Sequence, residues 1–260
     1  MPKWGNINER RNQLHEVIRL SGMNLIIDDT DHPLIIKVAS IQSARMQVYF
    51  IDNDDYFQNR LQVTDENGEE YEDNDARAIF YARGVLETVK KLRWCPDIIH
   101  CHGWMTALAP LYIKKAYKDE PSFRDAKVIF SLYEDDFKQA FHTDFSNKLL
   151  LKGIAKKRYC RIEGTHLTTQ HFLQNWLLTS PTALYSKSET RQMRKVLNYA
   201  PRNPEKPRIW KYQISPKNFL LKALQTTFYD KGYGKNRNKN KKFRQNFNSN
   251  CSGSKVNVLR

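Results

Sequence analysis

The sequence of 260 residues lacks any long apolar segment. No uninterrupted apolar run approaches the roughly 18 residues of a membrane-spanning helix, and no apolar stretch follows a basic start as in a secretory signal peptide. Its four cysteines, Cys95, Cys101, Cys160 and Cys251, form no regular disulfide framework. These absences argue against membrane-embedded and disulfide-stapled secreted proteins, and they predict a soluble protein of the reducing cytoplasm.

Several catalytic motifs are also missing. No glycine-rich fingerprint opens a helix, so the sequence predicts neither a dinucleotide-binding turn nor a phosphate-binding P-loop, and we expect no cofactor. No serine stands in a nucleophile elbow. A metal site would need three or four converging ligands, and Cys95, His100, Cys101 and His102 lack the spacing of zinc sites, so we expect no metal.

Acidic residues become scarce in the second part of the chain. Residues 1–150 hold 19 Lys and Arg against 24 Asp and Glu, a net charge of −5, whereas residues 151–260 hold 24 against 4, a net charge of +20. Lys, Arg and Asn dominate Lys231–Asn250, and this composition predicts disorder. The charge asymmetry indicates a boundary. We therefore divide the chain into a first domain at 1–157, a poorly defined region at 158–230 and a basic disordered tail at 231–260.

The first domain alternates between strand and helix patterns. Amphipathic periodicity predicts helices over Asp73–Trp94 and Trp104–Tyr117. Runs of β-branched and aromatic residues predict strands at Asn24–Ile27, Leu34–Ile41, Met46–Ile51, Pro96–His100 and Lys127–Leu132. The alternation predicts an α/β fold with a Rossmann-like, doubly wound parallel sheet.

An acidic stretch, Asp65–Asp75, separates a strand from a helix and contains Gly68. Such a charge run is usually a solvated loop, and we expect one here. A cation or ligand role is the weaker alternative.

The segment Pro96–Leu108 has the layout of a ligand-binding edge. In open α/β sheets, ligands bind beyond the carboxyl ends of the strands, where helix N-termini present unpaired N–H groups. We predict a strand ending at His100, a turn through Cys101–Gly103, and then a helix. We expect His100 and His102 to point to opposite faces of the strand, so that both would not face one ligand. For each histidine alone, a structural hydrogen-bonded role is the more common one.

Four segments, in one order, resemble the N-terminal domain of bacterial glycogen synthases and plant starch synthases. They are Pro2–Gly5, Val48–Asn53, Tyr71–Asn74 and, above all, Pro96–Leu108, within a resemblance that covers about residues 1–155. The resemblance implies the N-terminal half of a GT-B glycosyltransferase, which transfers glucose from ADP-glucose or UDP-glucose to an α-1,4-glucan with retention of configuration. It implies that this half offers a glucan surface and part of the donor-glucose pocket.

The sequence departs from the family pattern in ways that affect chemistry. It starts after the family's first strand and its Lys-x-Gly-Gly loop, which reaches the donor phosphates. Gly103 stands where the family has a sugar-contacting Asp, and Tyr133 stands where it has a catalytic-site His. The Arg, Lys and Glu of the family's second domain have no counterpart in residues 156–260.

These departures predict an incomplete and inactive N-domain. Positioned cations stabilise a departing nucleoside diphosphate, and losing one stabilising group costs on the order of 10²–10³ in rate. The remaining sugar- or glucan-binding candidates are His100, His102, Trp104 and Tyr133, with an α-glucan and ADP-glucose as ligands.

Three other roles stay open for this sequence. The chain could be a non-catalytic glucan-binding or regulatory partner of a synthase, or a transferase completed by a partner chain that supplies the second domain. It could also bind polyanions through its basic tail, where contact with nucleic acid would be non-specific.

A shifted reading frame would explain the change of character after Lys157. The segment Leu173–Tyr185 can be encoded so that a two-base offset reads Ala-Lys-Leu-Ala-Ile-Asp-Phe-Ser-Asp-Gly-Val-Ile. That hidden peptide resembles the helix and strand that end the family's first domain. We therefore hold a frameshifted region 158–230 as a hypothesis.

Overall fold

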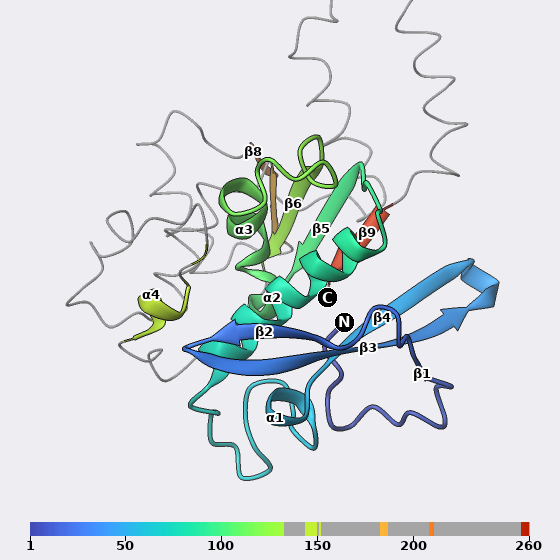
Figure 1. Ribbon diagram of the computed structural model, residues 1–260, viewed down its shortest axis with the longest axis vertical. Coiled ribbons are helices and arrows are strands. Elements are labelled where there is room, and N and C mark those ends of the chain that lie inside the picture. The colour runs from blue at the N-terminus through green and yellow to red at the C-terminus, as the bar shows by residue number, and fades with distance from the viewer. Residues whose placement is uncertain (133–143, 150, 152–182, 187–207, 211–255, 260) are drawn as a thin grey trace, which may run out of the picture.

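The computed structural model describes residues 1–132, 144–149, 151, 183–186, 208–210 and 256–259. These residues form a mixed α/β structure with two sheets (Figure 1). Within them, no helix is both long enough and apolar enough to cross a membrane.

The first sheet is antiparallel. Its strands are β1 (His15–Glu16), β2 (Met23–Ile27), β3 (Thr30–Ile41) and β4 (Met46–Asp52), and the other three all pair with β3. Asp28 and Asp29 connect β2 to β3 with φ angles of 53° and 57°, as a type I′ hairpin turn requires. The 3₁₀ turn η1 (Gln42–Ala44) and Arg45, with φ 49°, connect β3 to β4. Both connections are too short for the crossover between parallel strands.

The prediction of one parallel sheet is therefore wrong for the first three predicted strands. The second sheet is parallel throughout, with the order β8-β7-β6-β5-β9. Its strands are β5 (Ile98–His102), β6 (Lys127–Leu132), β7 (Ala183–Ser186), β8 (Arg208–Trp210) and β9 (Val256–Leu259). The mostly apolar β9 lies within the tail for which we predict disorder. The rest of 231–260 lies outside the described residues.

Five helical segments complete the described structure. They are α1 (Asp54–Phe57), α2 (Asn74–Lys91), η2 (Trp104–Thr106), α3 (Ala109–Lys115) and α4 (Phe145–Lys148). The Asn53 side chain caps α1 by accepting hydrogen bonds from the backbone N–H groups of Asp55 and Tyr56. The predicted helix Asp73–Trp94 is confirmed as α2. The predicted helix Trp104–Tyr117 is divided into η2 and α3, since a continuous helix would set Pro110 against the carbonyl of Thr106.

Helix α2 lies between the two sheets and is buried along most of its length (Figure 1). It contacts β2 and β4 on one side and η2, α3 and α4 on the other. A Cβ atom at Gly84 would lie 3.0 Å from the side chains of Ile51 and Leu34, so glycine allows the helix to approach the antiparallel sheet closely. The second sheet is thereby held against the first through one shared helix.

The N-terminal segment is fastened to the antiparallel sheet by ion pairs. Lys37 Nζ lies 2.7 Å from Glu9 Oε1 and 2.8 Å from Asp52 Oδ2, and Lys3 Nζ lies 3.2 Å from Glu9. The hydrogen bond from Lys37 lowers the pKa of Glu9. Burial opposes a charged Lys37, but its bonds to Asp52 and Glu9 outweigh that effect and raise its pKa. At Gly5 the chain runs so close to the loop after α1 that an added Cβ would lie 2.6 Å from backbone atoms of that loop.

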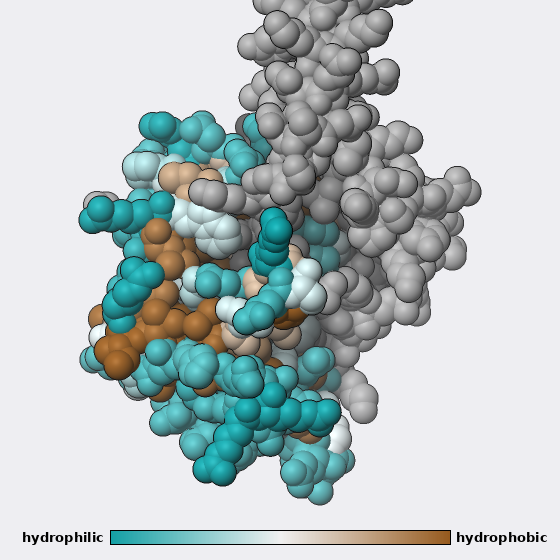
Figure 2. Space-filling model, turned by 90° about the vertical axis from the view of Figure 1, so that its right-hand side faces the viewer, coloured by the Kyte–Doolittle hydropathy of each residue, from teal (hydrophilic) through white to brown (hydrophobic). Residues whose placement is uncertain are grey.

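A few large apolar side chains stay outside the core. Figure 2 shows a face on which apolar side chains gather beside hydrophilic ones. The exposed large apolar residues of the described part are Met1, Ile18, Ile26, Ile41 and Met46. Ile41 and Met46 lie opposite each other where β3 turns into β4, so the end of this hairpin adds nothing to the core.

Candidate functional site

Strand β5 ends in a sharp turn. It runs to His102, two residues beyond the predicted end at His100. Gly103 follows with φ 68° and ψ −178°, a conformation open essentially to glycine alone. Its N–H donates to the carbonyl of Ser131 at 3.3 Å, and Thr106 Oγ1 donates to the carbonyls of His102 and Gly103 at 3.0 and 3.1 Å. The turn is thus fixed from the neighbouring strand and from η2.

The two histidines of β5 lie on the same face of the strand. Their ring centroids are 3.9 Å apart, with 41° between the ring planes. The prediction that they point to opposite faces is wrong, because side chains alternate between adjacent residues and residues two apart share a face. His100 is 4% exposed, and its Nε2 lies 2.8 Å from Ser131 Oγ. His102 is less buried as a residue than His100, but its Nε2 atom is buried.

The histidine pair lies on the face of the parallel sheet that is turned away from α2 and α3. Ile99, Cys101 and Phe130 pack into the core with these helices. Successive side chains of a strand point to opposite faces of the sheet, so His100 and His102 lie on the other face. Burial raises the pKa of the Cys101 thiol, so it stays protonated at neutral pH. Cys95 is exposed. Among the described residues, no group of three or more His, Cys, Asp or Glu side chains is arranged to hold a metal ion.

The other predicted sugar contacts have different surroundings. Trp104 is 8% exposed and belongs to the core cluster that α2 and α3 share, as does Met105. Tyr133 lies outside the described residues. The structure therefore brings His100, His102 and Gly103 together at the carboxyl edge of β5 and directs Trp104 into the core.

Two residues that the sequence does not mark as functional support this edge. Ser131 holds His100 and Gly103 from β6, and Thr106 holds the turn from η2. In the sequence Ser131 is one polar residue near the end of an apolar strand. Only the pairing of His102 with Ser131 in the β5–β6 register reveals its place at the site.

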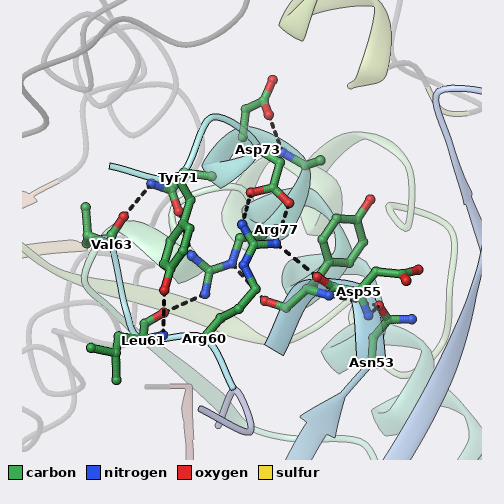
Figure 3. A network of polar contacts seen from close by, with 12 residues as sticks. Asn53, Asp55, Arg60, Leu61, Val63, Tyr71, Asp73 and Arg77 are labelled. Atoms are coloured by element: carbon green, nitrogen blue, oxygen red, sulfur yellow. Dashed lines mark hydrogen bonds and ion pairs between the residues drawn. The ribbon is translucent and has the colours of Figure 1, made fainter. Parts of the chain in front are cut away.

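A second polar network fixes the chain between α1 and α2 (Figure 3). Its centre is Arg77, which is fully buried and whose guanidinium carbon lies 4.8 Å from the ring centroid of Tyr71. Burial, reinforced by the nearby Arg60, lowers the pKa of Arg77 to about 10. Its hydrogen bonds go to the carbonyl oxygens of Tyr56, Leu61 and Gln62 and to Asn74 Oδ1.

The acidic stretch before α2 contributes to the same network. Arg60 NH1 lies 2.7 Å from Asp73 Oδ2, which ties the end of the stretch to the end of α1. The tip at 66–69 is exposed, as predicted, and the Asp65 carboxylate accepts the backbone N–H of Glu69. Asp75, by contrast, is fully buried in α2 and lies 3.2 Å from Lys148. These contacts give the network a structural role.

The chain is similar to known glycogen and starch synthases. The sequence profile of a family described as starch synthase catalytic domain matches residues 1–180. A glycogen synthase from Pelodictyon phaeoclathratiforme is 33% identical over 188 residues, covering 72% of this chain and 38% of that protein. A glycogen synthase from Chlorobium luteolum is 39% identical over 134 residues, covering 51% and 27%. The chain thus spans less than half the length of these relatives.

A solved structure shares the fold. It is the catalytic domain of starch synthase IV from Arabidopsis thaliana, bound to ADP and acarbose. The TM-score is 0.57 at 15% sequence identity, and the similarity covers 81% of this chain and 42% of that one.

Proposed function

The chain belongs to the starch synthase catalytic domain family, and we propose that its first 157 residues form a glucan-binding N-domain that does not transfer glucose by itself. The observation that carries this proposal is the turn at the end of β5. His102 is the last residue of β5, and ligands of parallel α/β sheets bind beyond the carboxyl ends of the strands, which supports the proposal. The next residue, Gly103, has a backbone conformation that only glycine adopts readily. The family pattern has an Asp carboxylate at this position.

An α-glucan is the ligand that the relatives favour. The matched relatives are glycogen synthases, and the similar Arabidopsis structure holds ADP and acarbose. Imidazole nitrogens can donate or accept hydrogen bonds with sugar hydroxyls. We assign the first contact to His102, with His100 behind it, and we retain Tyr133 as a predicted contact. Trp104 packs into the core and is not retained. ADP-glucose is the proposed nucleotide ligand.

The proposed lack of transfer follows from missing chemistry. Glucosyl transfer needs groups that stabilise the departing diphosphate, and each lost group costs on the order of 10²–10³ in rate. Gly103 has no side chain to contact the sugar. We also propose that the reading frame is shifted within residues 158–230. The family profile still matches to residue 180, so the hypothesis applies chiefly to the residues after it. Sequencing the gene and its flanks tests that hypothesis.

Affinity electrophoresis in gels that contain glycogen tests the binding function. We expect glycogen to retard the wild-type chain and the variant His15→Ala, which removes an exposed histidine of β1. We expect His102→Ala to migrate without retardation while keeping the wild-type unfolding midpoint. Free migration of the wild-type chain would refute glucan binding, and equal retardation of His102→Ala would refute the assigned contact.

Transfer itself is measured with radiolabelled ADP-glucose and glycogen. We expect the chain alone to incorporate no label, and incorporation would contradict the proposed inactivity. A second candidate is a transferase completed by a partner chain. That candidate predicts incorporation only after a polypeptide with the family's second domain is added.

A further inference from the structure

The edge of β5 contains a buried hydroxyl, that of Ser131. Ser131, on β6, is 2% exposed, and its Oγ lies 2.8 Å from Nε2 of His100, which is 4% exposed. The two residues are 31 positions apart in the sequence, and the parallel register of β5 and β6 brings them together. The hydroxyl therefore contacts a buried imidazole from the adjacent strand.

Ser131 also restrains the backbone of the turn. Its carbonyl accepts the N–H of Gly103 at 3.3 Å, and in the strand register it pairs with His102. One residue of β6 thus holds the last part of β5 through its side chain and through its backbone.

The His100 ring transmits this restraint to the proposed ligand contact. The rings of His100 and His102 are in contact, with centroids 3.9 Å apart. The hydrogen bond between Ser131 Oγ and His100 Nε2 restrains the orientation of the His100 ring, and that ring is the surface on which His102 packs. Because the two rings are in contact, a change in the orientation of His100 changes the surface that His102 packs against.

We propose that Ser131 is a positioning residue, which orients His100 and through it sets the ring of His102 for an α-glucan hydroxyl. This inference rests on the proposed glucan-binding function of His102. Ser131 does not itself touch the sugar. Losing this hydroxyl lowers the fraction of molecules in which His102 is oriented to bind, and the apparent glucan affinity falls by the same factor, which we expect to be about threefold to tenfold.

The test uses the full chain with maltoheptaose as the probe. Titration calorimetry gives its affinity, and long-range ¹H–¹⁵N spectra report the tautomer and surroundings of the His102 imidazole. The variants are Ser131→Ala, which removes the hydroxyl, and Ser131→Thr, which retains it on a β-branched side chain that suits a strand. Ser122→Ala is the matched control, because Ser122 is also buried but precedes β6 at the other end of that strand.

We expect Ser131→Ala to move the His102 imidazole signals and to weaken maltoheptaose binding about threefold to tenfold. Ser131→Thr should restore both readouts, and Ser122→Ala should change neither. Unchanged His102 signals in Ser131→Ala, or a failure of Ser131→Thr to restore them, would overturn the positioning role. If the wild-type chain does not bind maltoheptaose, the proposed function fails, while the His102 signals of Ser131→Ala still decide whether Ser131 sets that ring.

Discussion

Replacing Gly103 with alanine should destabilise the protein, although it adds only one methyl group. The backbone at Gly103 has φ 68° and ψ −178°, and a Cβ atom in that region collides with neighbouring backbone atoms. Such strain costs about 1–3 kcal/mol. For a protein of this size, 1 kcal/mol lowers the melting temperature by about 2–4 °C, so Gly103→Ala should melt about 2–12 °C below wild type.

Thermal unfolding followed by circular dichroism measures this loss, with Gly68→Ala as the matched control. Gly68 also has a positive φ, 86°, but it lies in the exposed tip of the acidic loop, and no atom is within 4 Å of an added Cβ. The control therefore gives the cost of a positive φ in an open turn. We expect the larger loss at Gly103, where hydrogen bonds from β6 and η2 hold the turn in place.

The variant Gly103→Asp separates strain from chemistry. It supplies the carboxylate of the family pattern at the cost of the same backbone conflict. We expect it to be destabilised at least as much as Gly103→Ala and to gain no transfer of glucose from ADP-glucose. A melting temperature of Gly103→Ala within 1 °C of wild type would refute the reasoning, because the turn would then not depend on glycine.

Three further predictions concern stability. Gly5→Ala should lower the free energy of unfolding by about 1–3 kcal/mol in urea titrations, since its Cβ would lie 2.6 Å from the loop backbone; an unchanged midpoint would contradict that contact. Arg77→Met should cost about 3 kcal/mol or more in the same assay, because it leaves buried acceptors without a donor, and a loss below 1 kcal/mol would count against the network. The pKa of Glu9 is lower in the folded protein than the 4.5 of the unfolded chain, so the ionised Glu9 stabilises the fold above pH 4.5. This stabilisation is lost as the pH falls through the pKa that Glu9 has in the folded protein. We expect Glu9→Gln to lose slightly less stability than wild type between pH 7 and pH 3 in urea titrations, and the difference should be small because the Glu9 side chain is 41% exposed. Lys37→Met should show the same reduced loss, because it removes the hydrogen bond that lowers the pKa of Glu9. A Lys37→Met variant that loses as much stability with acid as wild type would contradict this explanation.

Most secondary-structure elements of the first 132 residues could be predicted from the sequence. The β-branched runs of β3, β4 and β6 and the apolar stripe of α2 are local patterns, and their positions are confirmed within a few residues. The prediction of parallel strands is wrong for the first sheet, because β3 begins at Thr30 rather than at Leu34 and the two-residue connection that remains, Asp28 and Asp29, forms a hairpin turn. The buried cation Arg77 could not be predicted, because an amphipathic stripe suggests one buried face and α2 has a sheet on one side and η2, α3 and α4 on the other.

The sequence by itself determined the family, through the order of its segments and the Pro96–Leu108 motif, and it placed the candidate site at the end of β5. These conclusions follow from neighbouring residues, whose propensities and spacing are local properties of the chain. The tertiary structure alone decided that His102 shares its face with His100, that Trp104 packs into the core, and that Ser131 holds the pair. Those contacts depend on strand register and on packing between segments far apart in the chain, which no local pattern encodes.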